Sequence, residues 1–297
     1  MGDYLTEQQH TRDPKRKPST TIPIDHSNER NSTDIPRIPV IPVHPDDWQD
    51  SRPTHNLNET ITKTDWWKAV SFLELEYRKR PVDYTCKNVT KRSNYEVCYD
   101  EQFKLGKPCL VYSFGIANDF SFDDEMATID GCEVHSFDPS MGVKDHVRKS
   151  SVHFHNIGIG GVVIENLDAR RDIYVTEQQT WMVMTLKTIM AALGHADRDI
   201  DVLKIDVEGS EWDVVEYLLE NGMLPRIKQF LTEWHIFSNW PHRSKNPKNL
   251  ELFRRIQQAG FKKFSSYMHT LIHNPEWVHL QADTFYVNTL YNSSRRH

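Results

Sequence analysis

The sequence predicts an α/β fold with a mostly parallel sheet and helices on both faces, and two observations carry this prediction. From Cys109 onward, apolar stretches of strand length alternate with amphipathic stretches of helical length. This order produces βαβ units, in which parallel strands are connected by helices that cover the sheet. The last two apolar stretches, FKKFSSYMHT and DTFYVNTL, have no helical stretch between them, which predicts an antiparallel hairpin at the C-terminal edge.

The expected elements follow in chain order. A helix is expected at 64–80, where Trp66, Val70, Leu73 and Tyr77 recur at helical spacing. Strands are expected in PCLVYSFGI, CEVHSFDPS, SVHFHNIGIG, DIDVLKIDVEG and IKQFLTEWHIF. Helices are expected in FDDEMATIDG, WMVMTLKTIMAALG, SEWDVVEYLLENG and NLELFRRIQQAG, each of which ends at a glycine. The segment 165–179 is expected to be a polar loop.

Composition divides the chain into four parts. Residues 1–62 hold eight of the fifteen prolines, so they are expected to form an extended or disordered tail or stalk. A helix and a cysteine-containing connector are expected at 63–107, the α/β domain at 108–290, and a short tail at 291–297.

The charge of the chain argues against a polyanionic partner. The formal net charge is −6 and the pI is near 6.2, so no basic surface for nucleic acid is expected. No apolar run reaches the length of a membrane span, and MGDYLTEQQH lacks the apolar region of a signal peptide. Taken alone, these features indicate a cytoplasmic protein.

Cysteines and glycosylation sequons indicate a different compartment. Cys86, Cys98, Cys109 and Cys132 cluster at the start of the expected domain, and an even set of this kind is able to form two disulfides. Four Asn-x-Ser/Thr sequons begin at Asn31, Asn58, Asn88 and Asn292. The alternatives of a secretory lumen and the cytoplasm, with buried thiols and accidental sequons, stay open.

A cofactor loop is expected after the first strand of the domain. Gly115 allows a tight turn, and the loop that follows offers backbone N–H groups and the side chains of Asn118 and Asp119. Asp138 ends the next strand, twenty-three residues after Gly115, where a carboxylate is able to bind the hydroxyls of a ribose. The loop lacks the second and third glycines of G-x-G-x-x-G, which disfavours a pyrophosphate and therefore NAD and FAD.

The stretches YSFGIANDFSFD, HSFDPS and LKIDVEGSEWDVV resemble the class I methyltransferases that use S-adenosylmethionine, and within them the FkbM-type and methyltransferase-like protein 24 families. The resemblance covers about 109–290. It implies a Rossmann-like fold with a seven-stranded sheet and S-adenosyl-L-methionine as cofactor. The implied cofactor-binding residues are Ser113, Gly115, Asn118, Asp119, Asp138, Ile157 and Gly158. Asp138 matches the acid that binds ribose, and Ile157 with Gly158 matches the segment beside the adenine. Ser113 stands where the family commonly has an acid, and Asp119 where it commonly has a glycine.

A second group of polar residues is expected at the same rim of the sheet. Asp206 and Glu208 follow one strand, and Glu233 and His235 end the next. We expect Asp206, Glu233 and His235 to be catalytic, with His235 or Asp206 as the base that accepts the proton of a hydroxyl. The same atoms are able to hold a divalent cation, but no ligand spacing of a known type appears, so no metal is predicted. Alternatively, Glu208 and Glu211 only favour the start of the helix that follows.

These features together predict methylation of a hydroxyl on a small molecule or glycan. The alternative is a catalytically inactive member of the fold that acts as a binding or scaffold protein, because the first loop is poor in glycine and lacks an acid. The oligomeric state is not predicted.

Overall fold

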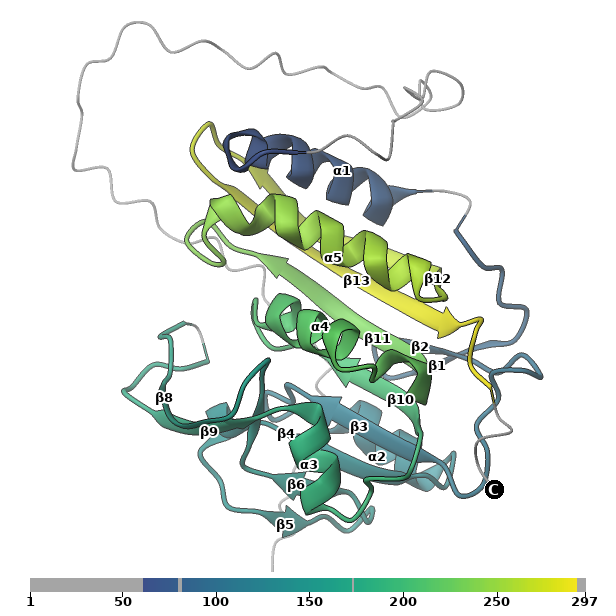
Figure 1. The fold of residues 1–297 in the computed structure, drawn as a ribbon. Helices are drawn as coiled ribbons and strands as arrows, with labels where there is room; N and C mark the ends of the chain where they lie inside the picture. Colours follow the sequence, from purple (N-terminus) through teal and green to yellow (C-terminus); the bar gives the residue numbers. More distant parts are fainter. Residues whose placement is uncertain (1–60, 80–81, 173, 293–297) are drawn as a thin grey trace, which may run out of the picture. The chain divides into compact units, whose positions relative to one another are not determined.

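The computed structural model describes residues 61–79, 82–172 and 174–292 (Figure 1). These residues belong to one compact unit, Thr54–His297. Most of the expected tail, with the sequons at Asn31 and Asn58, and the end of the chain from residue 293 lie outside the described residues. Within the described ranges, every helix is too short or too polar to cross a bilayer.

An eight-stranded sheet forms the centre of the unit, in the order β12-β13-β11-β10-β3-β4-β6-β5. Its strands are β3 (Leu110–Phe114), β4 (Glu133–Phe137), β5 (His146–Val147), β6 (His153–His155), β10 (Ile200–Ile205), β11 (Ile227–Ile236), β12 (Phe261–His273) and β13 (Val278–Asn288). The five strands from β6 to β11 run parallel, whereas β13 pairs antiparallel with β11 and with β12. The mostly parallel sheet and the C-terminal antiparallel hairpin are therefore confirmed. The short antiparallel strand β5 brings the count to eight instead of the expected seven.

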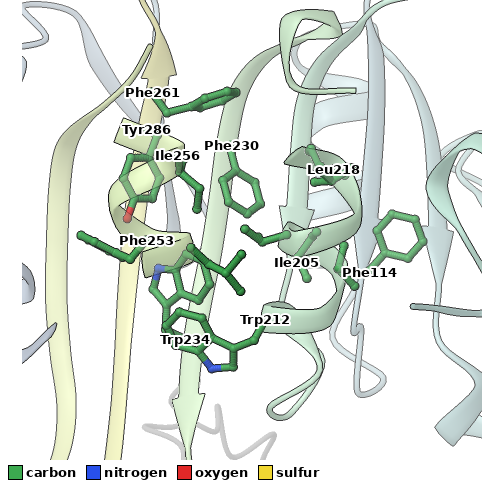
Figure 2. Packing of buried hydrophobic residues seen from close by; sticks show 14 of the residues in the cluster. Phe114, Ile205, Trp212, Leu218, Phe230, Trp234, Phe253, Ile256, Phe261 and Tyr286 are labelled. Atoms are coloured by element: carbon green, nitrogen blue, oxygen red, sulfur yellow. The ribbon is translucent and has the colours of Figure 1, made fainter. Parts of the chain in front are cut away.

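Two apolar layers cover the two faces of this sheet. On one face lie α1 (Trp66–Arg78), α3 (Leu186–Ala192), α4 (Glu211–Glu220) and α5 (Asn246–Gln258). Their core includes the ring pair Trp212 and Trp234, which packs beside Phe253 and Tyr286 (Figure 2). On the other face lie α2 (Ser121–Thr128) and the hairpin of β1 (Val89–Arg92) and β2 (Tyr95–Cys98). Helices on both faces agree with the sequence prediction.

Three expectations for the middle of the chain are wrong. The stretch SVHFHNIGIG is not one strand, because it divides into β6 and β7 (Gly158–Ile159), and β7 joins a separate sheet of order β7-β9-β8. The expected loop contains β8 (Ile164–Asp168), and the expected helix WMVMTLKTIMAALG begins as β9 (Thr180–Met184). The helix α3 starts only after Thr185, whose side chain accepts a hydrogen bond from Thr188 N. A continuous apolar run does not distinguish a strand from a helix, and this polar cap marks the boundary.

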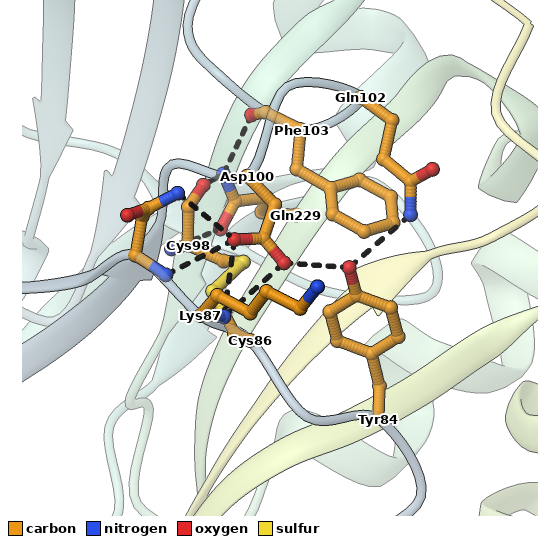
Figure 3. The surroundings of a disulfide bond; sticks show 9 residues. Tyr84, Cys86, Lys87, Cys98, Asp100, Gln102, Phe103 and Gln229 are labelled. Carbon is orange, nitrogen blue, oxygen red and sulfur yellow. Dashed lines mark hydrogen bonds between the residues drawn. A yellow bond between two sulfur atoms is a disulfide. The ribbon is translucent and has the colours of Figure 1, made fainter.

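One disulfide lies within the connector before the domain, and a second lies at the start of the domain. Cys86 pairs with Cys98, and Cys109 pairs with Cys132, so the four cysteines form the two bonds that their even number allows. Beside the first bond, the side chain of Gln229 on β11 hydrogen-bonds both the N–H and the C=O of Cys98 (Figure 3). The first disulfide thus closes a loop within the connector, and hydrogen bonds attach the connector to the sheet. The connector carries no clear pattern in the sequence.

A chain of hydrogen-bonded side chains starts at the beginning of β4. His135 Nδ1 lies 2.9 Å from His155 Nε2, and His135 Nε2 lies 3.1 Å from Glu133 Oε1. The same Glu133 oxygen lies 3.1 Å from His195 Nε2, and His195 Nδ1 contacts the hydroxyl of Tyr112 at 2.8 Å. Burial lowers the pKa of His135 to about 4, although the contact with Glu133 opposes this shift. The His135 ring is therefore neutral near neutral pH.

The pKa of His135 makes the fold sensitive to acid. Between pH 6.5 and 4 the unfolded chain binds a proton at this position that the folded chain does not, so the free energy of unfolding falls as the pH falls through this range. From pH 7.5 to 5.0 this group alone is expected to cost about 2 kcal/mol. The raised pKa of His235 has the opposite effect on the free energy of unfolding. The test therefore compares a variant of His135 with the wild type. Urea unfolding at both pH values should show a smaller loss of stability for His135→Gln than for the wild type; equal losses would contradict the assignment.

Candidate active site

The strand order reverses between β3 and β10, and the candidate site lies at the carboxyl ends of these strands. In open α/β sheets, ligands bind in the crevice at such a reversal. Gly115 follows β3 and Asp206 follows β10, and Asp206 N donates to Phe114 O at 3.1 Å. Gly115 has a φ of +81°, and a Cβ added to it would lie 1.7 Å from Asp206 O. Only glycine is compatible with this turn, because any side chain would overlap the neighbouring strand end.

The loop after Gly115 is held from two sides. Asp138 is buried, and its Oδ2 accepts hydrogen bonds from the N–H groups of Ile116 and Ala117, both at 2.8 Å. Its Oδ1 accepts from Ser140 N at 2.9 Å and from Ser140 Oγ at 2.6 Å. Lys204 Nζ donates to Gly115 O at 2.6 Å. Four donors thus surround the Asp138 carboxylate, which fixes the shape of the loop.

The remaining loop residues expected at the cofactor differ in their positions. Asn118 is exposed and has a φ of +64°. Asp119 accepts a hydrogen bond from Ser121 N at 3.0 Å, at the start of α2. The side chain of Ser113 is fully buried, and its expected contact with the cofactor stays a prediction. Alternation along β3 turns Ser113 toward α2, where it lies near the carboxyl group of Asp123.

Asp123 is a buried acid that the sequence analysis did not identify. Its Oδ1 accepts a hydrogen bond from Ser136 Oγ at 2.6 Å. Burial raises the pKa of the Asp123 carboxyl, while the positive charge of Lys204 and the hydrogen bond from Ser136 oppose the shift. The acid that the family commonly has at position 113 is thus absent from the strand, and a carboxyl group from the following helix lies beside Ser113.

A cavity of about 380 Å³ opens beside the residues that follow Asp138. Its lining includes Pro139, Asn156, Gln179, Trp181 and Met182. Gly158 lies next to it, because a Cβ at that position would be 3.3 Å from Pro139 Cγ. Ile157 is half-buried against the main core. A larger cavity of about 640 Å³ is lined by residues of α2 and β5, away from these residues. The only carboxylate in its lining, Asp124, is paired with Arg148.

The predicted catalytic residues lie together at the ends of β10 and β11. His235 is buried, and its Nε2 lies 3.4 Å from Glu233 Oε1, 3.8 Å from Glu208 Oε2 and 4.0 Å from Asp206 Oδ1. Its Nδ1 lies 3.0 Å from Oε1 of Glu211, a fully buried residue of α4. The convergence of Asp206, Glu233 and His235 that the sequence predicts is present in the structure.

The charges in this cluster change the role expected for His235. Burial alone would lower the pKa of His235, but Glu211, Glu233 and Glu208 outweigh it and raise this pKa well above 6.5. Burial raises the pKa of Glu208 to about 7, against the effect of His235. Near neutral pH the imidazole is therefore protonated and cannot accept a second proton.

Other residues of the cluster were not expected from the sequence. Glu211 was considered only as a charge at a helix start, and it is in fact a hydrogen-bond partner of His235. Tyr95 lies in the connector, where the sequence carries no clear pattern. Its hydroxyl donates a hydrogen bond to Asp206 Oδ2 at 3.2 Å. Asp283 is the neighbour of Glu233 across the β11–β13 pair and hydrogen-bonds His269 at 2.6 Å. The expected hairpin would have identified Asp283 only if its register had been known.

The sequence pattern of the family described as "Methyltransferase domain" matches residues 50–282, which is most of the chain. The chain belongs to the methyltransferase-domain family. This methyltransferase domain is 27% identical over 212 residues to the human protein "Probable methyltransferase-like protein 24", and the match covers 67% of this chain and 54% of the relative. The rat protein of the same name is 27% identical over 210 residues, with the same coverage. The chain thus spans about half the length of these relatives.

Proposed function

We propose that this methyltransferase domain transfers the methyl group of S-adenosylmethionine to a hydroxyl of a small molecule or glycan. One observation carries the proposal. The turn at Gly115 packs directly against the backbone of Asp206, so the candidate donor loop and the cluster around His235 lie on the two sides of one strand reversal. A donor and an acceptor bound on these two sides would meet at the carboxyl ends of β3 and β10.

The residues beside the loop fit an adenosine. The cavity at Pro139 offers the indole of Trp181 to a base. Asp138 lies between the loop and this cavity and would hold the ribose end. Because its carboxylate already accepts four hydrogen bonds, a ribose hydroxyl would share these oxygens or replace the Ser140 hydroxyl. Asn118 and Asp119 are the polar side chains of the loop available to the methionine end.

The donor, when bound, supplies an electrophilic methyl group, and the chain supplies alignment and a proton acceptor. A hydroxyl is a poor nucleophile while it keeps its proton, so a carboxylate of Asp206 or Glu233 would accept that proton. The protonated His235 would hold these carboxylates in place through its charge. Tyr95, which donates to Asp206, would keep one oxygen of that carboxylate oriented.

Transfer of a labelled methyl group tests this proposal. The full chain is incubated with labelled S-adenosylmethionine and a panel of monosaccharides, oligosaccharides and phenols. Asp206→Asn and Glu233→Gln are compared with Glu216→Gln, which changes a carboxylate on the outer part of α4. We expect one class of hydroxyl to be labelled, and at least one of the first two variants to lower kcat about 100-fold or more with unchanged donor affinity. Labelling confined to amines, or donor binding with no product from any acceptor, would overturn the proposal; the second result would favour the binding-protein alternative.

We also infer that the protein folds in an oxidising secretory compartment. The two disulfides support this inference. The sequon Asn88-Val89-Thr90 also supports it, because Asn88 is exposed at the start of β1, two residues after Cys86. A glycan in that compartment is then a plausible acceptor.

Glycosylation of Asn88 is the expected consequence. When the chain is expressed behind a secretion signal in animal cells, a peptide containing Asn88 should carry an N-linked glycan that a glycosidase removes. Thr90→Ala should abolish this modification, whereas Thr90→Ser should retain it. Mass spectrometry of the secreted chain measures the outcome. An unmodified Asn88 in a secreted, disulfide-bonded chain would contradict the expectation.

A further inference from the structure

We propose that Asp206, Glu208 and His235 bind a divalent metal ion at the rim of the sheet, beside the Gly115 turn. One ligand atom from each of these side chains lies within 4.8 Å of the other two. No ion was predicted from the sequence, because the ligands come from the ends of two strands and show no recognisable spacing. Its role in the reaction rests on the proposed function, whereas its binding does not.

The distances in the cluster leave room for an ion. Nε2 of His235 lies 3.8 Å from Glu208 Oε2 and 4.0 Å from Asp206 Oδ1, too far for direct hydrogen bonds. Metal bonds to nitrogen and carboxylate oxygen are about 2.0–2.2 Å long, so two ligands of one ion are separated by up to about 4.2 Å. The spacing is therefore that of atoms that share an ion. Glu233 Oε1, 3.4 Å from the same nitrogen, is a further candidate ligand.

The second nitrogen of the imidazole gives independent support for a metal site. Nδ1 of His235 contacts Oε1 of Glu211 at 3.0 Å, and Glu211 is fully buried. Glu211 is itself fixed, since it accepts hydrogen bonds from the N–H groups of Val207 and Gly209. A carboxylate on one ring nitrogen that turns the other nitrogen toward a metal is a recurrent arrangement in metalloproteins. On binding the ion, His235 would release the proton from Nε2 and coordinate through a neutral nitrogen, while Nδ1–H stays on Glu211.

The charges also favour a cation. Asp206, Glu208, Glu211 and Glu233 surround one imidazole. Arg170 is close, but it donates a hydrogen bond to the backbone oxygen of Glu208 at 3.1 Å and pairs with Asp172 at 3.6 Å, outside the cluster. Carboxylates gathered out of water repel one another, and a divalent ion offsets this cost. Mixed carboxylate and imidazole ligands suit ions such as Mn²⁺ and Zn²⁺.

Other groups of potential ligands in the described part of the chain are less suitable. In the group of Glu133, His135 and His195, the side chains contact one another at 3.1 Å, and Arg198 pairs with Glu133 at 2.6 Å. Direct contacts and a cation fill the position an ion would need. In the cluster at Asp206, the side chains of Asp206 and Glu208 are 13% and 29% exposed. This opening would leave a coordination position for an acceptor hydroxyl, whose pKa the ion would lower.

Titration of the metal-free full chain with Mn²⁺, followed by electron paramagnetic resonance of the free ion, tests the site. We expect one ion per chain with an affinity in the micromolar range or tighter. Glu208→Gln and His235→Gln should weaken binding about 100-fold or more, and Glu211→Gln should weaken it about 10- to 100-fold through the orientation of the ring. The control is Asp213→Asn, which removes an exposed carboxylate of α4 and should leave the affinity unchanged.

Circular dichroism selects the variants that keep their fold, and partly exposed Glu208 offers the safer substitution. No bound Mn²⁺ or Zn²⁺ at millimolar concentration, or binding that survives both Glu208→Gln and His235→Gln, would overturn the site. Calorimetric titration with S-adenosylmethionine in the presence of a chelator is measured separately. Loss of donor binding would count against the proposed function alone, and loss of metal binding against this inference alone.

Discussion

Gly115→Ala is expected to abolish the binding of S-adenosylmethionine and to lower the free energy of unfolding by about 2–5 kcal/mol, from backbone strain of about 1–2 kcal/mol and overpacking of about 1–3 kcal/mol. The added Cβ would lie 1.7 Å from Asp206 O, so the turn or the end of β10 has to move. Either movement displaces the loop that Asp138 and Lys204 hold. Urea unfolding and calorimetric titration measure the two effects.

A glycine without the close contact provides the control. Gly222 also has a positive φ, of +64°, but an added Cβ meets nothing within 4 Å. Gly222→Ala should therefore cost only the strain, about 1–2 kcal/mol, and should leave donor binding unchanged. If Gly115→Ala binds the donor as tightly as Gly222→Ala does, the loop is not the donor site.

Asp138→Asn is expected to lower donor affinity about 10- to 100-fold, the effect of losing a hydrogen bond to a charged group. The four hydrogen bonds at the Asp138 carboxylate all come from donors. An amide offers one accepting oxygen and turns its NH₂ group toward the other two donors. Either the loop N–H groups or Ser140 would lose a partner, at a cost of about 1–3 kcal/mol for each buried group. Calorimetry and urea unfolding again provide the measurements.

Asp119→Asn serves as a control for stability alone in the same loop. Oδ1 of Asp119 accepts hydrogen bonds from both N and Oγ of Ser121. An asparagine oxygen is able to keep both, so stability should change by less than about 0.5 kcal/mol. Equal donor affinity for Asp138→Asn and the wild type would show that Asp138 does not support the donor site.

The parts of the fold that the sequence predicts are those with strong periodic patterns. β3, β10 and β11 are stretches rich in apolar residues that precede helical repeats, and they form where expected. The region 151–185 was assigned wrongly because its strands are very short and belong to two sheets. Local periodicity does not indicate which strands will pair, since pairing depends on contacts between distant parts of the chain.

The candidate site was likewise predictable only in part. Gly115, Asp138, Asp206 and His235 follow or end predicted strands, so the parallel topology alone brings them to one rim. The network around them was not predictable. Whether His235 is a base or a cation depends on Glu211, which reaches it from a helix. The burial of Ser113 depends on the side of β3 that faces α2, and an apolar strand covered on both faces carries no alternation to reveal it.

A crystal structure of the full chain with S-adenosylhomocysteine, the product of the donor, tests the central claim most directly. We predict that the ligand lies across the carboxyl ends of β3 and β4, with its base in the cavity at Pro139 and Trp181 and its ribose at Asp138. Its sulfur should point toward Asp206 and the cluster at His235. A ligand bound elsewhere, or crystals that show none at millimolar concentration, would contradict the account.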